Sequence, residues 1–136
     1  MIRKLKSGQY DSLTEAQRRS AVLVGSTPGE GARSIQFRRQ YPGLPAEDLT
    51  ADQRRLVESV MREILSPYRR EDVDEVMTLI RRNGGLERLH LAFYRDRAAT
   101  DNTRWHFWRL EGPGFVWNYR VLPHVHCYVN VAVNRA

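Results

Sequence analysis

Cysteine is nearly absent from this chain of 136 residues, in which Cys127 is the single one. An internal disulfide framework is therefore excluded. The sequence also lacks an apolar run of transmembrane length, and no apolar segment of a secretory signal follows its basic start, residues 1–9. As written, the chain is expected to be cytoplasmic and soluble, without membrane insertion, whereas a fragment of a longer precursor would be compatible with export.

The familiar catalytic motifs are missing as well. The sequence has no G-x-S-x-G nucleophile elbow, no phosphate-binding P-loop and no dinucleotide-binding glycine fingerprint. It also has no C-x-x-C or H-E-x-x-H pattern that would identify a zinc site. The motifs therefore leave open whether the protein is an enzyme, and any candidate site has to be argued from individual residues.

What is present is the composition of a folded domain. Hydrophobic residues make up 41% and charged residues 28% of the chain, which is typical of a single soluble domain over residues 1–136. The net charge of +6 is carried mostly by arginine, in pairs interleaved with acids, as at Arg70-Glu71-Asp72. This mixture predicts solvated helix faces rather than one basic stripe, so nucleic acid is not expected as the main partner.

Three helices are predicted in the first part of the chain. Ser12 with Glu15, or Thr14 with Gln17, can form a capping box for a helix that runs to about Val24. Thr50 begins a second box for a helix that ends before Ser66-Pro67. A third helix is expected over residues 70–82, with its acids first and its arginines last. Between the first two, residues 25–46 contain seven glycines and prolines, which predicts a long loop with one short extended piece at 34–38.

The hydrophobic period changes to two after Leu86, which indicates strands. Helices followed by strands predict an α+β fold, with a helical part at about 12–85 packed on an antiparallel sheet at about 86–134. The four predicted strands are residues 89–95, 104–110, 114–121 and 125–133.

The last quarter of the chain is the richest in functional side chains. All three tryptophans and three of the four histidines lie within residues 105–131. His124 and His126 alternate with valines and Cys127, so a strand would place the two imidazoles on one face and the apolar set on the other. Cys127 is accordingly expected to be a buried structural thiol.

Two turns decide which side chains share a face with these histidines. A two-residue loop at Gly112-Pro113 would pair Leu110 with Phe115, Trp108 with Trp117 and His106 with Tyr119. At the next corner, a two-residue loop of Leu122-Pro123 pairs Tyr119 with His126, which gives a face walled by aromatic rings. A three-residue loop, 121–123, pairs Arg120 with His124 and Asn118 with His126.

We favour the three-residue loop. Proline in the second position of a two-residue loop requires a cis bond, whereas the longer loop separates polar from apolar side chains. The core face would then hold Trp108, Phe115, Trp117, Val125, Cys127 and Val129. The polar face would hold His124, His126, Arg109, Arg120, Asn118 and Glu111, with His90 on the first strand.

Three kinds of site fit these residues. A metal site would use His124 and His126 with a third ligand from His90, His106 or Glu111, and imidazoles suit zinc, copper, nickel or iron. An acid–base or anion site would use either strand histidine for proton transfer, with Arg109 and Arg120 holding a carboxylate or phosphate.

A third interpretation is a module that binds a small molecule or a protein partner through aromatic rings, with Tyr128 and Asn118 among the contacts. A structural role without a catalytic site is the remaining alternative. The oligomeric state is not predicted by any of these patterns.

Residues 105–131 resemble the C-terminal signature of domain of unknown function family 3500, an uncharacterised bacterial family. The matching string is WHFWRLEGPGFVWNYRVLPHVHCYVNV. The helix starts LTEAQR at 13–18 and LTADQR at 49–54 are similar to the paired L-T-x-x-Q-R helix starts of that family, and LHLAFY at 89–94 is similar to its following strand. The resemblance covers roughly residues 12–133. It implies no established activity, although members are typically longer and often look exported.

Overall fold

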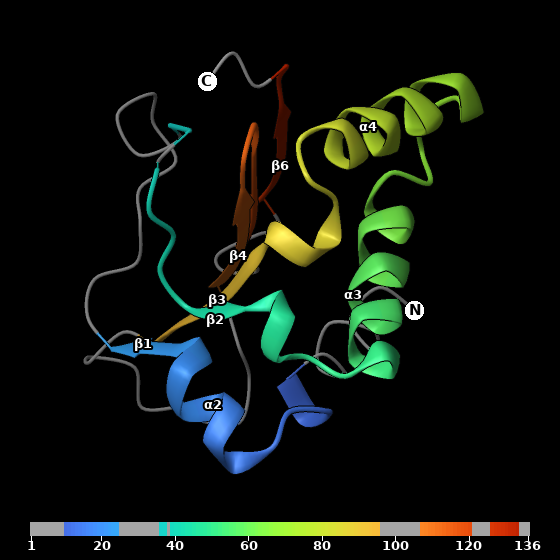
Figure 1. Ribbon diagram of the computed structural model, residues 1–136. Helices are drawn as coiled ribbons and strands as arrows, with labels where there is room; N and C mark the ends of the chain where they lie inside the picture. Colours follow the sequence, from blue (N-terminus) through green and yellow to red (C-terminus); the bar gives the residue numbers. More distant parts are fainter. Residues whose placement is uncertain (1–9, 25–35, 38, 96–106, 121–125, 134–136) are drawn as a thin grey trace.

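Figure 1 shows the computed structural model, which describes residues 10–24, 36–37, 39–95, 107–120 and 126–133. Within these residues, three α-helices combine with one mixed sheet, so the predicted α+β class is confirmed. The helices are α2 (Glu15–Ala21), α3 (Ala51–Ile64) and α4 (Arg70–Arg82), and the short 3₁₀ helices are η1 (Ala46–Asp48) and η2 (Leu86–Arg88). The strands are β1 (Val22–Val24), β2 (Leu44–Pro45), β3 (His90–Arg95), β4 (Phe107–Gly112), β5 (Phe115–Arg120) and β6 (His126–Val131).

The capping box at Thr50 is confirmed, and at the first helix the structure has the Thr14 box rather than the Ser12 alternative. The glutamines of the two boxes also contact each other. Gln17 accepts from the Thr14 N–H and Gln53 accepts from the Thr50 N–H, each at 2.9 Å. The two glutamine side chains also bond each other reciprocally, at 2.9 and 2.8 Å. The glutamines of the repeated L-T-x-x-Q-R segment therefore cap the two helices and also connect the start of α2 to the start of α3.

The first helix is shorter than predicted. It ends at Ala21, and Val22–Val24 instead form β1, which pairs in parallel with β3. Two β-branched residues in three favour the extended backbone once a neighbouring strand is available. The periodicity could not show this, because the partner strand lies about 70 residues further along the chain.

Among the described residues, the sheet has six strands rather than the predicted four, and it is mixed rather than purely antiparallel. The strand order is β1-β3-β4-β5-β6, with β2 pairing β3 off this path. The four long strands are antiparallel neighbours, as expected, but each differs from its predicted bounds. The two additional strands are only two and three residues long and come from the segment interpreted as helix end and loop.

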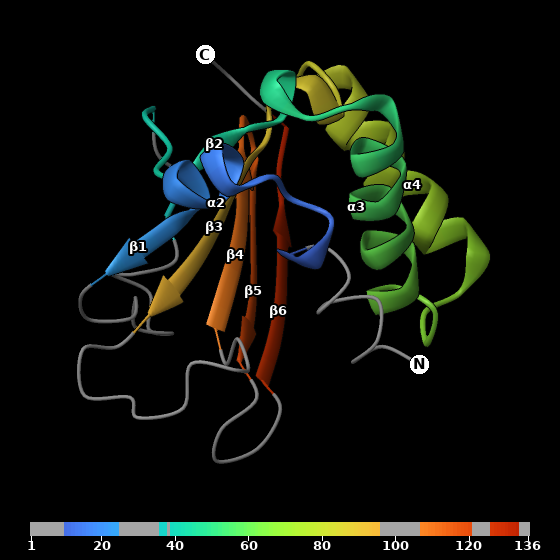
Figure 2. The same ribbon diagram turned by 90° about the horizontal axis from the view of Figure 1, so that it is seen from below.

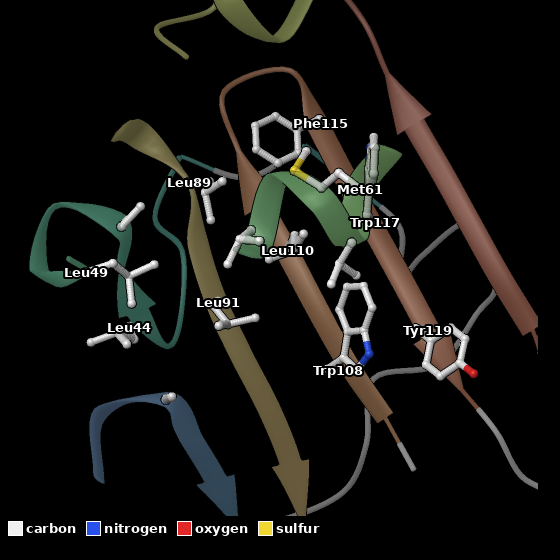
Figure 3. Close-up of a cluster of buried hydrophobic side chains, with 14 of the residues drawn as sticks. Leu44, Leu49, Met61, Leu89, Leu91, Trp108, Leu110, Phe115, Trp117 and Tyr119 are labelled. Carbon is white, nitrogen blue, oxygen red and sulfur yellow. The ribbon is translucent and has the colours of Figure 1, made fainter. Parts of the chain in front are cut away.

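Helices α3 and α4 lie together on one side of the sheet (Figures 1 and 2). Alternate residues of β4 and β5 face them and form the core, and Met61 of α3 packs into this core in front of the sheet (Figure 3). Trp108 and Trp117 are each 1% exposed, as the core interpretation of these tryptophans requires. The main apolar side chains of this layer are Leu44, Leu49, Met61, Leu89, Leu91, Trp108, Leu110, Phe115, Trp117 and Tyr119.

Candidate functional site

The side of the sheet that faces away from this core carries a different set of side chains. Because successive strand residues point to opposite faces, the residues between the core positions share the second face. We call this surface the polar face. Its described members are His90, Ala92, Tyr94, Phe107, Arg109, Glu111, Val116, Asn118, Arg120, His126, Tyr128 and Asn130.

The strand register arranges the polar face in three rows across the sheet. Directly opposed residues in neighbouring antiparallel strands have Cβ atoms about 4.5–5.5 Å apart, so members of one row are neighbours. The register thereby brings together seven of the nine residues singled out from the sequence. The rows are His90, Glu111, Val116 and Asn130; Ala92, Arg109, Asn118 and Tyr128; and Phe107, Arg120 and His126.

The centre of the polar face is buried although it is charged. Arg109, Glu111 and Asn118 are each 1% exposed. The Arg109 Nη1 atom lies 3.7 Å from Glu111 Oε1, which is an ion pair beyond hydrogen-bond distance. Arg109 Nε donates to Asn118 Oδ1. Removing such charges from water costs several kcal/mol per ion, and this cost offsets much of the attraction between Arg109 and Glu111. Stabilisation of the fold alone therefore does not explain why the cluster is buried.

The contact with Arg109 fixes the orientation of the Asn118 amide. A guanidinium N–H can only donate, so the atom that faces it must be the carbonyl oxygen of Asn118. The Asn118 Nδ2 atom is therefore turned the other way. It is buried and has no hydrogen-bond acceptor among the residues that the structure describes.

Gln53 provides a comparison within the same molecule, because it is also a buried amide. Its oxygen accepts from the Thr50 N–H and from Gln17, and its nitrogen donates to the Ser12 carbonyl and to Gln17. All four hydrogen-bonding positions of Gln53 are thus used by the protein. Asn118, which is more deeply buried, has only its oxygen bonded in this way.

The edge of the polar face near β3 adds an imidazole and a phenol. His90 Nδ1 is buried and lacks a partner within the described part of the chain. The ring of Tyr41 lies against His90, with 5.3 Å between centroids. Burial raises the pKa of Tyr41 above its usual 10.0, an effect that Arg88 opposes and Glu111 reinforces. Tyr41 was missed in the sequence because it stands in a loop rich in glycine and proline, with no periodic pattern.

The other edge, at β6, pairs a guanidinium with a second imidazole. Arg120 Nη2 lies 2.7 Å from His126 Nδ1 and 3.5 Å from His126 Nε2. The His126 ring also meets Tyr128 edge to face, with 6.2 Å between ring centroids. His126 and Arg120 are half-buried, so this edge joins the buried centre to the surface.

The predicted pairing of the β4–β5 hairpin is wrong by two residues. The structure pairs Gly112 with Phe115, Leu110 with Trp117 and Trp108 with Tyr119. The two-residue turn is Pro113-Gly114, since Gly114 takes a φ of +77° that glycine tolerates best. A shift of two residues preserves which side chains share a face, so the separation of polar from apolar residues survives the error.

The corner before β6 differs from both loops considered in the sequence. Arg120 pairs with His126 and Asn118 with Tyr128, so the pairings of the three-residue loop are wrong by two residues. The two-residue loop is also wrong, since Tyr119 pairs with Cys127 rather than with His126. His126 nevertheless lies on the face that the favoured loop gave it. The connecting residues 121–125, including His124 and Val125, lie outside the described residues, as does His106.

Cys127 is exposed rather than buried, which corrects the expectation of a structural thiol in the core. It does lie on the apolar side of β6, opposite Tyr119. However, the end of α4 meets β6 at its other end, where Asn83 donates to the Ala132 carbonyl. The alternation therefore predicted the correct face but not how far the helices extend over it.

The structure tests the predicted metal site for only some of its ligands. Within the described ranges, no three His, Cys, Asp or Glu side chains group closely enough to hold a metal ion. The two remaining predicted ligands, His124 and His106, are outside these ranges, so a site that includes them stays a prediction. The Arg120 guanidinium beside His126 Nδ1 weighs against a metal on that atom, because the two positive charges would repel.

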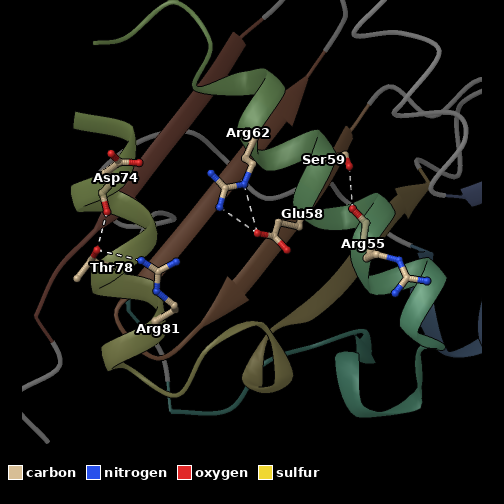
Figure 4. Close-up of polar contacts among 7 residues, drawn as sticks. All are labelled: Arg55, Glu58, Ser59, Arg62, Asp74, Thr78 and Arg81. Carbon is tan, nitrogen blue, oxygen red and sulfur yellow. Dashed lines mark hydrogen bonds and ion pairs between the residues drawn. The ribbon is translucent and has the colours of Figure 1, made fainter. Parts of the chain in front are cut away.

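Arg55 and Arg62 of α3 and Arg81 of α4 lie on the side of the helices that faces away from the sheet (Figure 4). Arg62 bonds Glu58 one turn away at 3.1 Å, and Arg81 donates to Thr78 at 3.2 Å. The ion pair of Arg62 with Glu58 contributes about 0.3–0.5 kcal/mol. Both contacts fit the expected solvated helix faces. None of the described helices is both long and apolar enough to span a membrane.

Comparisons with known proteins give a family but no activity. No curated protein and no solved structure matches the chain significantly. The family model described as "Protein of unknown function (DUF3500)" matches residues 3–131, and this confirms the resemblance to that family. With nearly its whole length matched, the chain belongs to the DUF3500 family.

Proposed function

We propose that this protein binds a small ligand carrying an oxyanion, a carboxylate or a phosphate, on the polar face of its sheet. The observation that carries the proposal is the buried Asn118 Nδ2 group, which has no acceptor within the described part of the chain. A buried donor without an acceptor costs about 1–3 kcal/mol, so such a group calls for a partner. A ligand oxygen at this position would supply the acceptor.

The charges of the polar face favour an anion. Two guanidinium groups, Arg109 and Arg120, stand on this face with one carboxylate, Glu111. Arg109 is held by Asn118 and Glu111 before any ligand arrives, so little side-chain entropy is lost on binding. Hydrogen bonds to an ionised acceptor are shorter and roughly twice as strong as neutral ones. The burial of these donors strengthens the effect, because less water screens them.

The test is a titration of the protein with acetate and with inorganic phosphate, followed by NMR of side-chain amide and guanidinium N–H signals. We expect at least one anion to shift the Asn118 amide signals in a saturable way. The informative variant is Asn118→Asp, which keeps an oxygen for Arg109 but replaces the donor by a second acceptor. We expect about tenfold weaker binding or more, because the new charge repels the anion.

Asn130→Asp is the matched control for this variant. It makes the same chemical change on the same face, but at a half-buried position next to Val116 on the outer strand. Binding should be weakened less in this control than in Asn118→Asp. The proposal is wrong if neither anion shifts the Asn118 signals, or if both variants bind as the wild type does. Equal weakening in both variants would show a general charge effect and would also contradict it.

A further inference from the structure

A second buried polar atom without a partner lies on the polar face, at its edge near β3. His90 Nδ1 has no hydrogen-bond partner among the described residues, and the same is true of Asn118 Nδ2 near the centre. The ring of Tyr41 packs against the His90 imidazole, with 5.3 Å between the two centroids. Each of the two unpartnered atoms costs free energy as long as nothing bonds it. A ligand long enough to reach both atoms would remove both costs.

The strand register determines how far apart these two atoms lie. His90 on β3 is opposite Glu111 on β4, which is opposite Val116 on β5. Asn118 follows Val116 two residues later along β5. Two strand spacings and a rise of two residues place the Cα atoms of His90 and Asn118 about 12 Å apart. A hydrogen bond takes up about 3 Å at each end, so the two ligand atoms are about 6 Å apart. Acetate and phosphate are too small to reach both.

The chemistry of the β3 edge favours an uncharged group at the second end of the ligand. A neutral imidazole nitrogen carries either a proton or a lone pair, and a hydroxyl group can bond either one because it both donates and accepts. A second oxyanion is disfavoured, since Glu111 is the direct neighbour of His90 across the strands. The charges of Arg88 and Glu111 act on the pKa of Tyr41 in opposite directions, so the edge favours neither an anion nor a cation.

The surface between the two ends is polar as well. Arg109 lies opposite Asn118, and Glu111 lies opposite His90. A ligand that extends from Asn118 to His90 therefore passes a buried guanidinium and a buried carboxylate. An alkyl chain in this place would keep both charged groups away from water without offering them a polar partner, which is unfavourable. Further hydroxyl groups along the ligand avoid this cost.

We propose that the ligand of the polar face is a sugar acid or a sugar phosphate, with its oxyanion at Asn118 and a distant hydroxyl group at His90 Nδ1. The oxyanion part rests on the proposed function, and the hydroxyl part adds a subsite that acetate and inorganic phosphate do not reach. His90 is then a specificity-determining residue. At the opposite edge of the face His126 already contacts Arg120, which is why the second end of the ligand is assigned to the β3 edge.

D-gluconate, D-glucarate and acetate separate the contributions of the two ends. All three carry a carboxylate, but gluconate ends in a hydroxyl group and glucarate in a second carboxylate. NMR of the Asn118 amide and of the His90 ring nitrogens follows each end during a titration. We expect gluconate to shift both sets of signals and to bind at least about fivefold more tightly than acetate. Glucarate should bind more weakly than gluconate, because its second charge lies beside Glu111.

The corresponding pair for a phosphate is glucose 6-phosphate and inorganic phosphate. It replaces gluconate and acetate if the wild type prefers phosphate. The expected order is the same, because only the sugar phosphate has hydroxyl groups that reach His90.

His90→Phe tests the subsite, since it keeps a ring against Tyr41 and removes both nitrogens. Gluconate should then bind no more tightly than acetate, whereas the affinity for acetate should be unchanged. His126→Phe is the matched control, because it makes the same change at the opposite, half-buried edge of the face. It should retain the preference for gluconate over acetate. Circular dichroism checks the folding of both variants, and the wild-type titrations test the proposal even if His90→Phe does not fold.

Equal affinities of gluconate and acetate for the wild type would overturn the proposal, and so would His90 signals that do not respond to gluconate. A preference for gluconate that persists in His90→Phe, or that is lost equally in His126→Phe, would also contradict it. Acetate can still shift the Asn118 signals in each of these cases, so the proposed function is judged separately. If none of the ligands shifts the Asn118 signals, both the proposed function and the subsite are wrong.

Discussion

The two faces of the β4–β5 hairpin are equally buried and chemically opposite. Trp108 and Trp117 on one face are 1% exposed, and so are Arg109 and Asn118 on the other. Burial of the tryptophans stabilises the fold through the hydrophobic effect, which needs no specific partner. Burial of the charged and amide groups is favourable only as far as each one finds its partners. The apolar face therefore accounts for the stability of the fold. The burial of charged and amide groups on the polar face needs a different explanation, such as a role in binding.

Loss of a large core side chain gives the largest expected effect. Trp117→Ala should lower the free energy of unfolding by about 3–5 kcal/mol, because it removes apolar contacts and leaves a cavity. Denaturant unfolding followed by far-UV circular dichroism measures this difference. Tyr68→Ala is a suitable control, as Tyr68 is 62% exposed and should contribute about 0.5 kcal/mol or less. A loss below about 1 kcal/mol for Trp117→Ala would show that this face is not the main core.

The polar face can be probed by breaking its ion pair in two ways. Arg109→Met alone should cost about 3–5 kcal/mol, because it leaves the buried Glu111 carboxylate uncompensated. The double variant Arg109→Met/Glu111→Leu should recover this loss and reach wild-type stability or exceed it by about 1–4 kcal/mol. Denaturant unfolding of both proteins tests the prediction. If the double variant is no more stable than the single one, the ion pair is needed for folding rather than for ligand binding.

The fully bonded Gln53 amide sharpens the contrast with Asn118. Gln53→Ala removes four hydrogen bonds that join two helix starts, so we expect a loss of about 1–3 kcal/mol in the free energy of unfolding. Thermal or urea unfolding measures it, with the exposed Gln40→Ala as control. A loss no larger than that of the control would mean that the two capping boxes do not fasten α2 to α3.

The smallest expected effect concerns the alkaline limit of stability. The pKa of Tyr41 is raised above 10.0, mainly by burial, so the fold favours the protonated phenol. Its contribution to stability is complete below pH 10.0 and is lost as the pH rises through the higher pKa of the folded state. Tyr41→Phe should therefore lose stability less steeply than the wild type in this range. Identical slopes of unfolding free energy against pH would contradict a pKa of Tyr41 that burial raises in the folded state.

Much of the fold could be predicted because its signals are local. The capping boxes at Thr14 and Thr50 and the apolar spacing of α3 and α4 depend on residues within a few turns of each other. Strand alternation likewise predicted that Trp108 would be in the core and Arg109 on the opposite face. The short strands β1 and β2 were missed because they depend on a partner far away in the sequence.

The face on which His126 lies was predicted, but its partner on the neighbouring strand was not. The favoured three-residue loop placed His126, Asn118 and Arg109 on one face, and an even shift in register could not change that. Which residue lies opposite which was wrong at both turns, since a turn position depends on backbone angles such as the positive φ of Gly114. The contact of Tyr41 with His90 depends on the path of a loop. The loop has no hydrophobic periodicity from which its path could be predicted.

The sequence by itself determined the family, the helix starts and the division of the sheet into an apolar and a polar face. The family follows from the resemblance of sequence motifs. The helix starts and the two faces follow from local hydrogen bonding and from a period of two residues, which are independent of distant contacts. Only the tertiary structure decided that the polar face is buried, that Asn118 has one bonded and one unbonded end, and that Arg120 meets Nδ1 of His126. Burial and hydrogen-bond partners depend on what packs against a face, and no local pattern contains that information.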